Sequence, residues 1–123
     1  LIEHRSVVGY LSWAVRAYPG LSGAGLLHSS VSFDLTVTAL FGPLVCGGVV
    51  VVAALEDDLP TRGLLAKWPL TFVKATPSHI TLLDALPSVF SPSGDLVVGG
   101  EQLAGEALQR WRSAHPGAVV VNE

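Results

Sequence analysis

The chain has 123 residues, half of them hydrophobic and only 14% charged, a composition that suits one domain with a buried core. Its formal net charge of −3 argues against a nucleic-acid partner, because phosphate binding calls for a basic surface. The longest apolar run, residues 44–55, is too short and too interrupted by glycine to span a bilayer, so we expect no membrane partner. A single cysteine excludes an internal disulfide bond and is compatible with the reducing cytoplasm.

Helix-like and strand-like patterns alternate along the chain. The first helix is expected to follow Ser6, a residue type favoured at helix N-termini, and to stop at Pro19-Gly20. Gly47-Gly48 is expected to end the second helix. In chain order, the sequence predicts a helix over 7–17, a strand over 25–29, a helix over 34–45, a strand over 49–54, a helix opening near Pro60, a strand over 70–74, a helix over 78–86, a strand over 95–98, a helix over 103–114 and a strand over 118–121.

This alternation indicates an α/β fold, with a mostly parallel five-stranded sheet between helices on both faces. Ligands of such sheets bind in the crevice beyond the carboxyl ends of the strands. The chain begins at Leu1 without methionine and ends directly after the last strand. We therefore expect residues 1–123 to form a single subdomain excised from a larger protein, whose other parts cover its apolar faces.

Polar residues gather where the predicted strands end. Asp34 follows the first strand by a short loop, Lys74 ends the third strand, and Glu123 follows the fifth. Asp34 has two interpretations, a helix N-cap whose carboxylate accepts from backbone N–H groups, or a carboxylate that pairs with a cationic ligand. Leu35 and Thr38 are three residues apart on the same predicted helix, so both of them and Asp34 can face one cavity.

The other strand-end residues also have two interpretations. Lys74 is either a lysine that extends to water or a donor aimed into a pocket. Val97 and Gly99 share one face of the fourth strand, where the glycine either ends the strand or leaves room for a ligand. Glu123 has an exposed loop carboxylate as its default interpretation. No histidine has metal-ligand spacing, and no nucleophile motif or phosphate-binding loop is present, so we predict no catalytic residue and no metal site.

Six stretches in order along nearly the whole chain resemble the amino-acid adenylation domains of nonribosomal peptide synthetases: EHRSVV (3–8), SFDLTV (32–37), LFGPL (40–44), ATPSH (75–79), VGGEQL (98–103) and VNE (121–123). The resemblance implies the internal flavodoxin-like subdomain of such a domain, with a three-layer arrangement. The family reaction forms an aminoacyl-adenylate and pyrophosphate from an amino acid and ATP, with Mg, and then passes the aminoacyl group to the phosphopantetheine of a peptidyl carrier domain. Most of that machinery is expected in the remainder of the adenylation domain, so we expect the fragment alone to be inactive and to hold no cofactor.

Residue by residue, the resemblance assigns a substrate pocket. Asp34 resembles the aspartate that pairs with the substrate α-ammonium group, and Phe33 resembles the aromatic gate beside that carboxylate. Gly100 and Asn122 resemble positions near the adenine of ATP or AMP. The residues at the family's specificity-determining positions are Leu35, Thr38, Lys74, Val97, Gly99 and Glu123. Together with Asp34, they resemble the pattern of asparagine- or aspartate-activating domains.

Simple chemistry chooses between these two substrates. An asparagine side chain offers an acceptor to Lys74 and an NH2 donor to Glu123, whereas an aspartate side chain is repelled by an ionised Glu123. An unpaired polar group costs ~1–3 kcal/mol, so we predict asparagine first and aspartate second. Two rival classes are a free-standing flavodoxin-like binding or regulatory module, whose characteristic loops are missing, and an acyl-CoA ligase, whose substrate has no α-ammonium group for Asp34.

Overall fold

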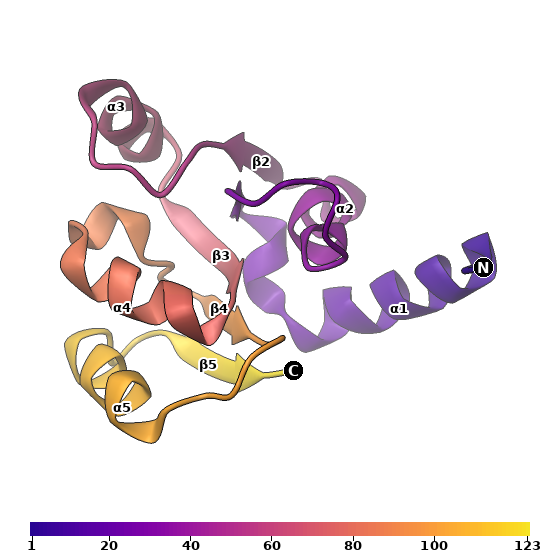
Figure 1. The fold of residues 1–123 in the computed structure, drawn as a ribbon. Helices are drawn as coiled ribbons and strands as arrows, with labels where there is room; N and C mark the ends of the chain where they lie inside the picture. The colour runs from indigo at the N-terminus through magenta and orange to yellow at the C-terminus, as the bar shows by residue number, and fades with distance from the viewer.

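The computed structural model describes residues 1–123 as a single sheet covered by helices (Figure 1). Its five strands are β1 (Ala24–Leu27), β2 (Val49–Val52), β3 (Leu70–Ala75), β4 (Asp95–Val98) and β5 (Val119–Asn122). They lie in the order β2-β1-β3-β4-β5, and every neighbouring pair is parallel. The predicted α/β class and parallel flavodoxin-like sheet are confirmed.

Helices cover the sheet on both faces, as the alternating pattern predicts (Figure 1). They are α1 (His4–Ala17), α2 (Thr36–Cys46), α3 (Leu59–Lys67), α4 (Pro77–Ala85) and α5 (Gly105–Ala114), with two short 3-10 turns, η1 (Pro19–Ser22) and η2 (Ser88–Phe90). α1 and α2 lie over the buried strand residues Leu27, Phe72 and Val97. The other three helices lie over the alternate strand residues Leu26, Val73, Leu96 and Val98. The period-two alternation of the strands thus divides the core into two layers.

Three element boundaries near the predicted pocket differ from the sequence-based expectation, at α1, β1 and α2. α1 begins at His4, ahead of Ser6, and the Glu3 carbonyl accepts from the Ser6 N–H at 2.9 Å. Ser6 is therefore a residue of the first turn and not the N-cap. β1 ends at Leu27, so His28 lies in the loop that follows the strand, where its side chain is free to approach β3.

α2 begins two residues later than predicted, at Thr36, and Asp34 and Leu35 lie in a turn ahead of it. The Phe33 carbonyl accepts from the Thr36 N–H at 3.2 Å and from the Thr36 hydroxyl at 2.7 Å. No helix N–H is bonded to the Asp34 carboxylate, so the interpretation of Asp34 as an N-cap is wrong. The helix ends at Gly47, as predicted, with a φ of 75° that glycine adopts readily.

The order of the strands reverses between β1 and β3. From β1 the chain passes through α2 to β2 on one side, whereas β3 is followed by β4 and β5 on the other side. The connections that leave the carboxyl ends of β1 and β3 therefore diverge. In parallel sheets this divergence opens a crevice, which is the usual place for a ligand.

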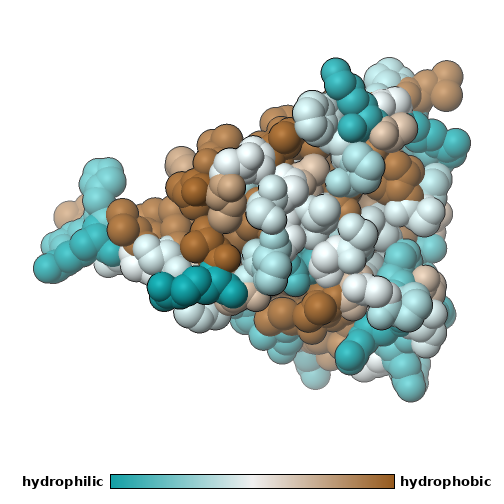
Figure 2. Space-filling model, turned by 180° about the vertical axis from the view of Figure 1, so that it is seen from behind, coloured by the Kyte–Doolittle hydropathy of each residue, from teal (hydrophilic) through white to brown (hydrophobic).

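Large apolar side chains are exposed over α1 and α2. Figure 2 shows hydrophobic residues gathered around the place where α1 leaves the body of the molecule. The exposed large apolar residues of these two helices are Val8, Trp13, Phe41, Leu44 and Val45. Extended apolar surface on a folded domain marks a contact site for another surface. No helix combines the length and apolar character that crossing a membrane requires.

Candidate functional site

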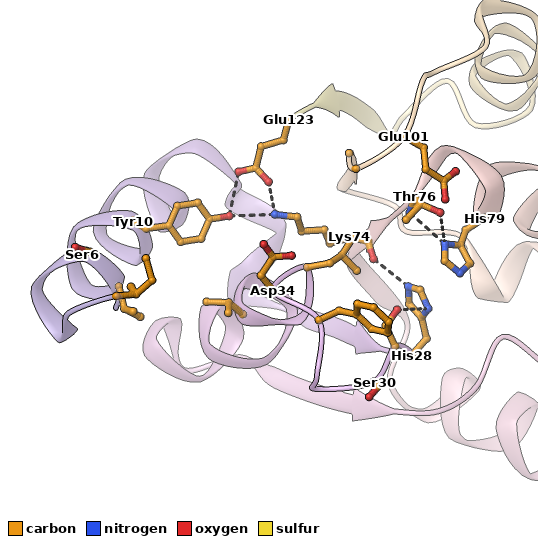
Figure 3. Close-up of a pocket in the computed structure, with 18 residues that line it drawn as sticks. Ser6, Tyr10, His28, Ser30, Asp34, Lys74, Thr76, His79, Glu101 and Glu123 are labelled. Carbon is orange, nitrogen blue, oxygen red and sulfur yellow. Dashed lines mark hydrogen bonds and ion pairs between the residues drawn. The ribbon is translucent and has the colours of Figure 1, made fainter.

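A cavity of about 1000 Å³ opens at the carboxyl ends of β1, β3 and β4, between α1 and the turn before α2 (Figure 3). This is the place where the strand order reverses. Seven of the ten residues predicted for the site line the cavity, namely Phe33, Asp34, Leu35, Lys74, Gly99, Gly100 and Glu123. Parallel strands end at a common edge, and this explains why residues from four separate parts of the chain meet there.

Lys74 lies at the centre of a polar network on the floor of this cavity. Side chains alternate along β3, so Lys74 points to the same face as Phe72, beneath α1 and α2. Its ammonium group forms an ion pair with Glu123 and lies 3.2 Å from the Tyr10 hydroxyl (Figure 3). It also lies 3.2 Å from the Thr38 hydroxyl. An ammonium group has three protons, so these three partners satisfy it completely.

Glu123 is held on both of its carboxylate oxygens. Oε2 pairs with Lys74, while Oε1 accepts from the Tyr10 hydroxyl at 3.0 Å and from the Tyr18 hydroxyl at 3.4 Å. The Glu123 side chain is 25% exposed, against 11% for Lys74, so the pair is reachable from the cavity on the glutamate side. The Glu123 carboxylate therefore points toward Lys74 on the floor of the cavity.

The environment of the pair changes two pKa values. Burial is the largest influence on Lys74 and acts to lower its pKa, but the hydrogen bonds with Glu123 and Tyr10 outweigh burial and raise the pKa above the ordinary value. Burial, followed by the charge of Glu123, raises the pKa of the Tyr18 hydroxyl. Lys74 is therefore a fixed cation at neutral pH, and Tyr18 is a permanent hydrogen-bond donor.

Asp34 presents a carboxylate that the protein itself leaves free. The residue is exposed, lines the cavity and makes only a backbone contact with the helix, where its carbonyl accepts from Val37 at 3.0 Å. Phe33 and Leu35 line the cavity on either side of it. The oxygens of Asp34 are thus available to a cationic group that enters from solvent.

Three of the predicted residues lie outside the cavity lining. Thr38 and Val97 are fully buried, Thr38 beneath the Lys74 ammonium and Val97 beside Lys74 in the ladder between β3 and β4. Asn122 is exposed at the end of β5, opposite Val98. Thr38 and Val97 thus pack around Lys74 and do not form the surface of the cavity.

Position 99 requires glycine because the backbone of Glu123 lies against it. A Cβ added there would lie 2.6 Å from the Glu123 carbonyl oxygen, which is far inside contact distance. The space that Gly99 leaves free is therefore occupied by the end of β5, and this close approach brings Glu123 over β4. Gly100 follows with a φ of 83°, a conformation that favours glycine.

Known proteins resemble the chain in both sequence and fold, although no protein-family model matches it. Bacitracin synthase 3 of Bacillus licheniformis is 40% identical over 132 aligned residues, which cover 100% of this chain and 2% of that protein. The structure of a nonribosomal peptide synthetase protein containing adenylation and PCP domains superposes with a TM-score of 0.68 and 26% identity, over 84% of this chain and 18% of that one. The chain is a relative of the nonribosomal peptide synthetase adenylation domains.

A second solved structure of a nonribosomal peptide synthetase, FmoA3 with AMPPNP bound, agrees with this assignment. It superposes with a TM-score of 0.80 and 26% identity, and the match covers 98% of this chain and 14% of that one. The chain thus spans a small part of each relative, 2% of the first protein and 18% and 14% of the two solved chains.

Two groups of cavity residues in this adenylation-type fold were missed from the sequence. Tyr10 lies on α1, where nothing in the helical pattern marks it as a contact of Lys74 and Glu123. His28 and His79 form the opposite wall, with rings 4.9 Å apart in an edge-to-face arrangement. The position of His28 directly after β1 was a usable signal, because polar residues at strand ends are the ones that meet in the crevice.

The two histidines serve different parts of the backbone. His28 Nε2 donates to the Lys74 carbonyl at 2.9 Å, and burial lowers the pKa of its ring. His79 Nδ1 accepts from the Thr76 N–H at 3.1 Å as one half of the capping box that begins α4. Both rings therefore rigidify the carboxyl end of β3, from which Lys74 reaches the cavity.

Proposed function

We propose that the chain is the substrate-selecting part of an amino-acid adenylation domain. The complete domain would form an aminoacyl-adenylate from ATP and a small polar amino acid and pass the aminoacyl group to the phosphopantetheine of a peptidyl carrier domain. The observation that carries the proposal is one cavity that contains both the free carboxylate of Asp34 and the Lys74–Glu123 pair. The relationship to synthetases that contain adenylation and PCP domains supports it.

Asp34 and the ion pair divide the recognition of an amino acid between them. Asp34 supplies a negative charge without an internal partner, which suits the α-ammonium group common to all amino acids. Lys74 and Glu123 supply a donor and an acceptor side by side, which suits a side chain that carries both kinds of group. Phe33, 65% exposed at the rim, is placed to cover the bound substrate.

A carboxamide fits this arrangement better than a carboxylate. The asparagine carbonyl can accept from Lys74 while its NH2 group donates to Glu123, so no polar group is left unpaired. An aspartate side chain gains from Lys74 but meets the charge of Glu123 at close range. We therefore place asparagine first and aspartate second among the substrates.

The remaining chemistry belongs to parts of the adenylation domain beyond this chain. Gly100, in the cavity lining, and Asn122, at the end of β5, are proposed to lie near the adenine ring. The chain has no group of three or more His, Cys, Asp or Glu side chains that could hold a metal ion, so we assign no magnesium ligand to it. The exposed apolar residues of α1 and α2 suit a surface that the rest of the domain covers.

The test is amino-acid-dependent pyrophosphate exchange by a complete adenylation domain that carries this chain. We expect asparagine to give the highest kcat/KM, and Asp34→Asn to lower that value about 10- to 100-fold, because the charge that would pair with the substrate α-ammonium group is lost. Asp57→Asn is the matched control, since Asp57 pairs with Arg62 and lies outside the cavity lining. Preference for a bulky apolar amino acid would overturn the proposal.

A further inference from the structure

Tyr10 joins the three polar groups of the floor although it comes from the first helix of the chain. Its hydroxyl oxygen lies 2.6 Å from Thr38 Oγ1, 3.2 Å from Lys74 Nζ and 3.0 Å from Glu123 Oε1. We propose that Tyr10 is a positioning residue for substrate selection, whose hydroxyl holds the Glu123 carboxylate in the orientation that accepts from a substrate carboxamide. This inference rests on the proposed function, because it concerns how the same cavity chooses a side chain.

Only one arrangement of protons satisfies the whole network. A phenol has one proton to donate and two lone pairs to accept with. Glu123 can only accept and the Lys74 ammonium can only donate, so Tyr10 donates to Glu123 and accepts from Lys74. Thr38 then donates to Tyr10 and accepts from Lys74. Tyr10 is fully used, and its only donor bond is the one that fixes Glu123.

The hydrogen bonds of Lys74 indicate which one a substrate carboxamide would replace on entering the cavity. All three Lys74 protons already have partners, so a substrate carbonyl must displace one of them. Thr38 is fully buried behind the lysine, and Glu123 is the acceptor for the substrate NH2 group. Tyr10, which lines the cavity, is therefore the partner that releases Lys74. Its bond to Glu123 is independent of this exchange and persists in the complex.

Tyr18 cannot replace Tyr10 in this role. Its hydroxyl contacts the same Glu123 oxygen at 3.4 Å, which is long for an O–H···O hydrogen bond. Its ring is 2% exposed between Trp13 and Phe72 and does not line the cavity. The direction of the Glu123 carboxylate therefore depends mainly on Tyr10.

Loss of the Tyr10 hydroxyl should change selection more than catalysis. Without it, Glu123 is free to turn toward solvent, and one donor of Lys74 is left without a partner. The freed lysine donor is open to either substrate, but only a substrate carboxamide loses the fixed acceptor for its NH2 group. Tyr10→Phe is therefore expected to weaken asparagine binding and to favour aspartate.

The experiment compares Tyr10→Phe with the unsubstituted complete adenylation domain in pyrophosphate exchange with asparagine and with aspartate. We expect KM for asparagine to rise about threefold to tenfold, the effect of one hydrogen bond, with kcat little changed. The ratio of kcat/KM for asparagine to that for aspartate should fall. Ser12→Ala, which removes an exposed hydroxyl from the same helix, is the control and should behave as the unsubstituted domain.

The outcomes separate this inference from the proposed function. An unsubstituted domain that activates neither asparagine nor aspartate refutes both. A domain that activates asparagine, with Tyr10→Phe indistinguishable from Ser12→Ala, refutes the positioning role alone. A fall in kcat and thermal stability with an unchanged substrate ratio also refutes it, since that result means a structural role. Phe keeps the aromatic ring that packs near Trp13, so the variant is expected to fold.

Discussion

Replacement of Glu123 by Gln tests how the pocket separates asparagine from aspartate. The substitution keeps the size of the side chain and removes its charge. In the structure the carboxylate pairs with Lys74 and accepts from Tyr10, so the uncharged amide loses the stronger part of both interactions. An aspartate side chain that reaches Lys74 then meets a neutral neighbour, and an asparagine side chain loses its charged acceptor.

The size of the expected change follows from the separation of the Glu123 and substrate carboxylates and from the exposure of Glu123. Two carboxylates about 4 Å apart repel by about 4 kcal/mol near a protein surface. Glu123 is 25% exposed, so solvent reduces the repulsion, and we take about 1–2 kcal/mol as the part that acts on the substrate. Its removal is worth about fivefold to thirtyfold in kcat/KM for aspartate relative to asparagine.

The assay is competition between the two amino acids in pyrophosphate exchange by the complete domain. Glu106→Gln is the matched control, because Glu106 is an exposed carboxylate in the first turn of α5, outside the cavity lining. We expect the ratio to move toward aspartate in Glu123→Gln only. A ratio that stays constant, or that moves toward asparagine, would show that Glu123 does not repel the substrate carboxylate.

Two further predictions concern the frame around the pair, each measured by urea unfolding of the complete domain. Gly99→Ala should lower the free energy of unfolding by about 1–3 kcal/mol, because the added Cβ would lie 2.6 Å from the Glu123 carbonyl oxygen. Gly117→Ala is the control and should leave the free energy of unfolding unchanged, because nothing lies within 4 Å of its added Cβ. Equal effects of the two substitutions would show that the close approach of Glu123 to Gly99 does not matter for stability. Burial lowers the pKa of His28 in the folded protein below the ordinary value of 6.5. As the pH falls through 6.5, His28 is therefore protonated in the unfolded chain before it is protonated in the folded one, and the folded state loses stability. His28→Gln should flatten the pH dependence from about pH 7.5 to about pH 5, and an unchanged slope would refute this origin.

The sequence predicted the sheet and much of the site for the same reason. Apolar runs without polar alternation mark buried parallel strands, and the strand over 95–98 was predicted at the bounds that the structure has. Residues at or just after the carboxyl end of such a strand lie at the crevice, and this places Lys74, Gly99 and Glu123 at the same edge without any knowledge of side-chain contacts. Periodicity and parallel topology predicted only where these residues lie, whereas their role as substrate contacts was implied by the resemblance to adenylation domains.

Contacts between elements were beyond the reach of that reasoning. Tyr10 is 64 residues from Lys74 and 113 residues from Glu123, and its meeting with them depends on how α1 packs over the sheet. The N-cap interpretation of Asp34 was wrong for a local reason, because the Phe33 carbonyl accepts from the Thr36 N–H and hydroxyl and the helix starts later. Helix-capping propensity ranks residue types for the N-cap position, but it does not say which of several neighbouring acceptors will bond to the first N–H groups of the helix.

The polar floor also constrains how the selectivity of this pocket can change. Lys74 is stable beneath α1 and α2 only because Glu123, Tyr10 and Thr38 together satisfy its three protons. Removal of one partner leaves a charge or a hydroxyl unpaired in a shielded place, which costs more than the partner contributed by itself. Replacement of the whole set by apolar residues leaves nothing unpaired. A change from a polar to an apolar substrate therefore requires coordinated substitution of the network, and single substitutions should be non-additive when they are combined.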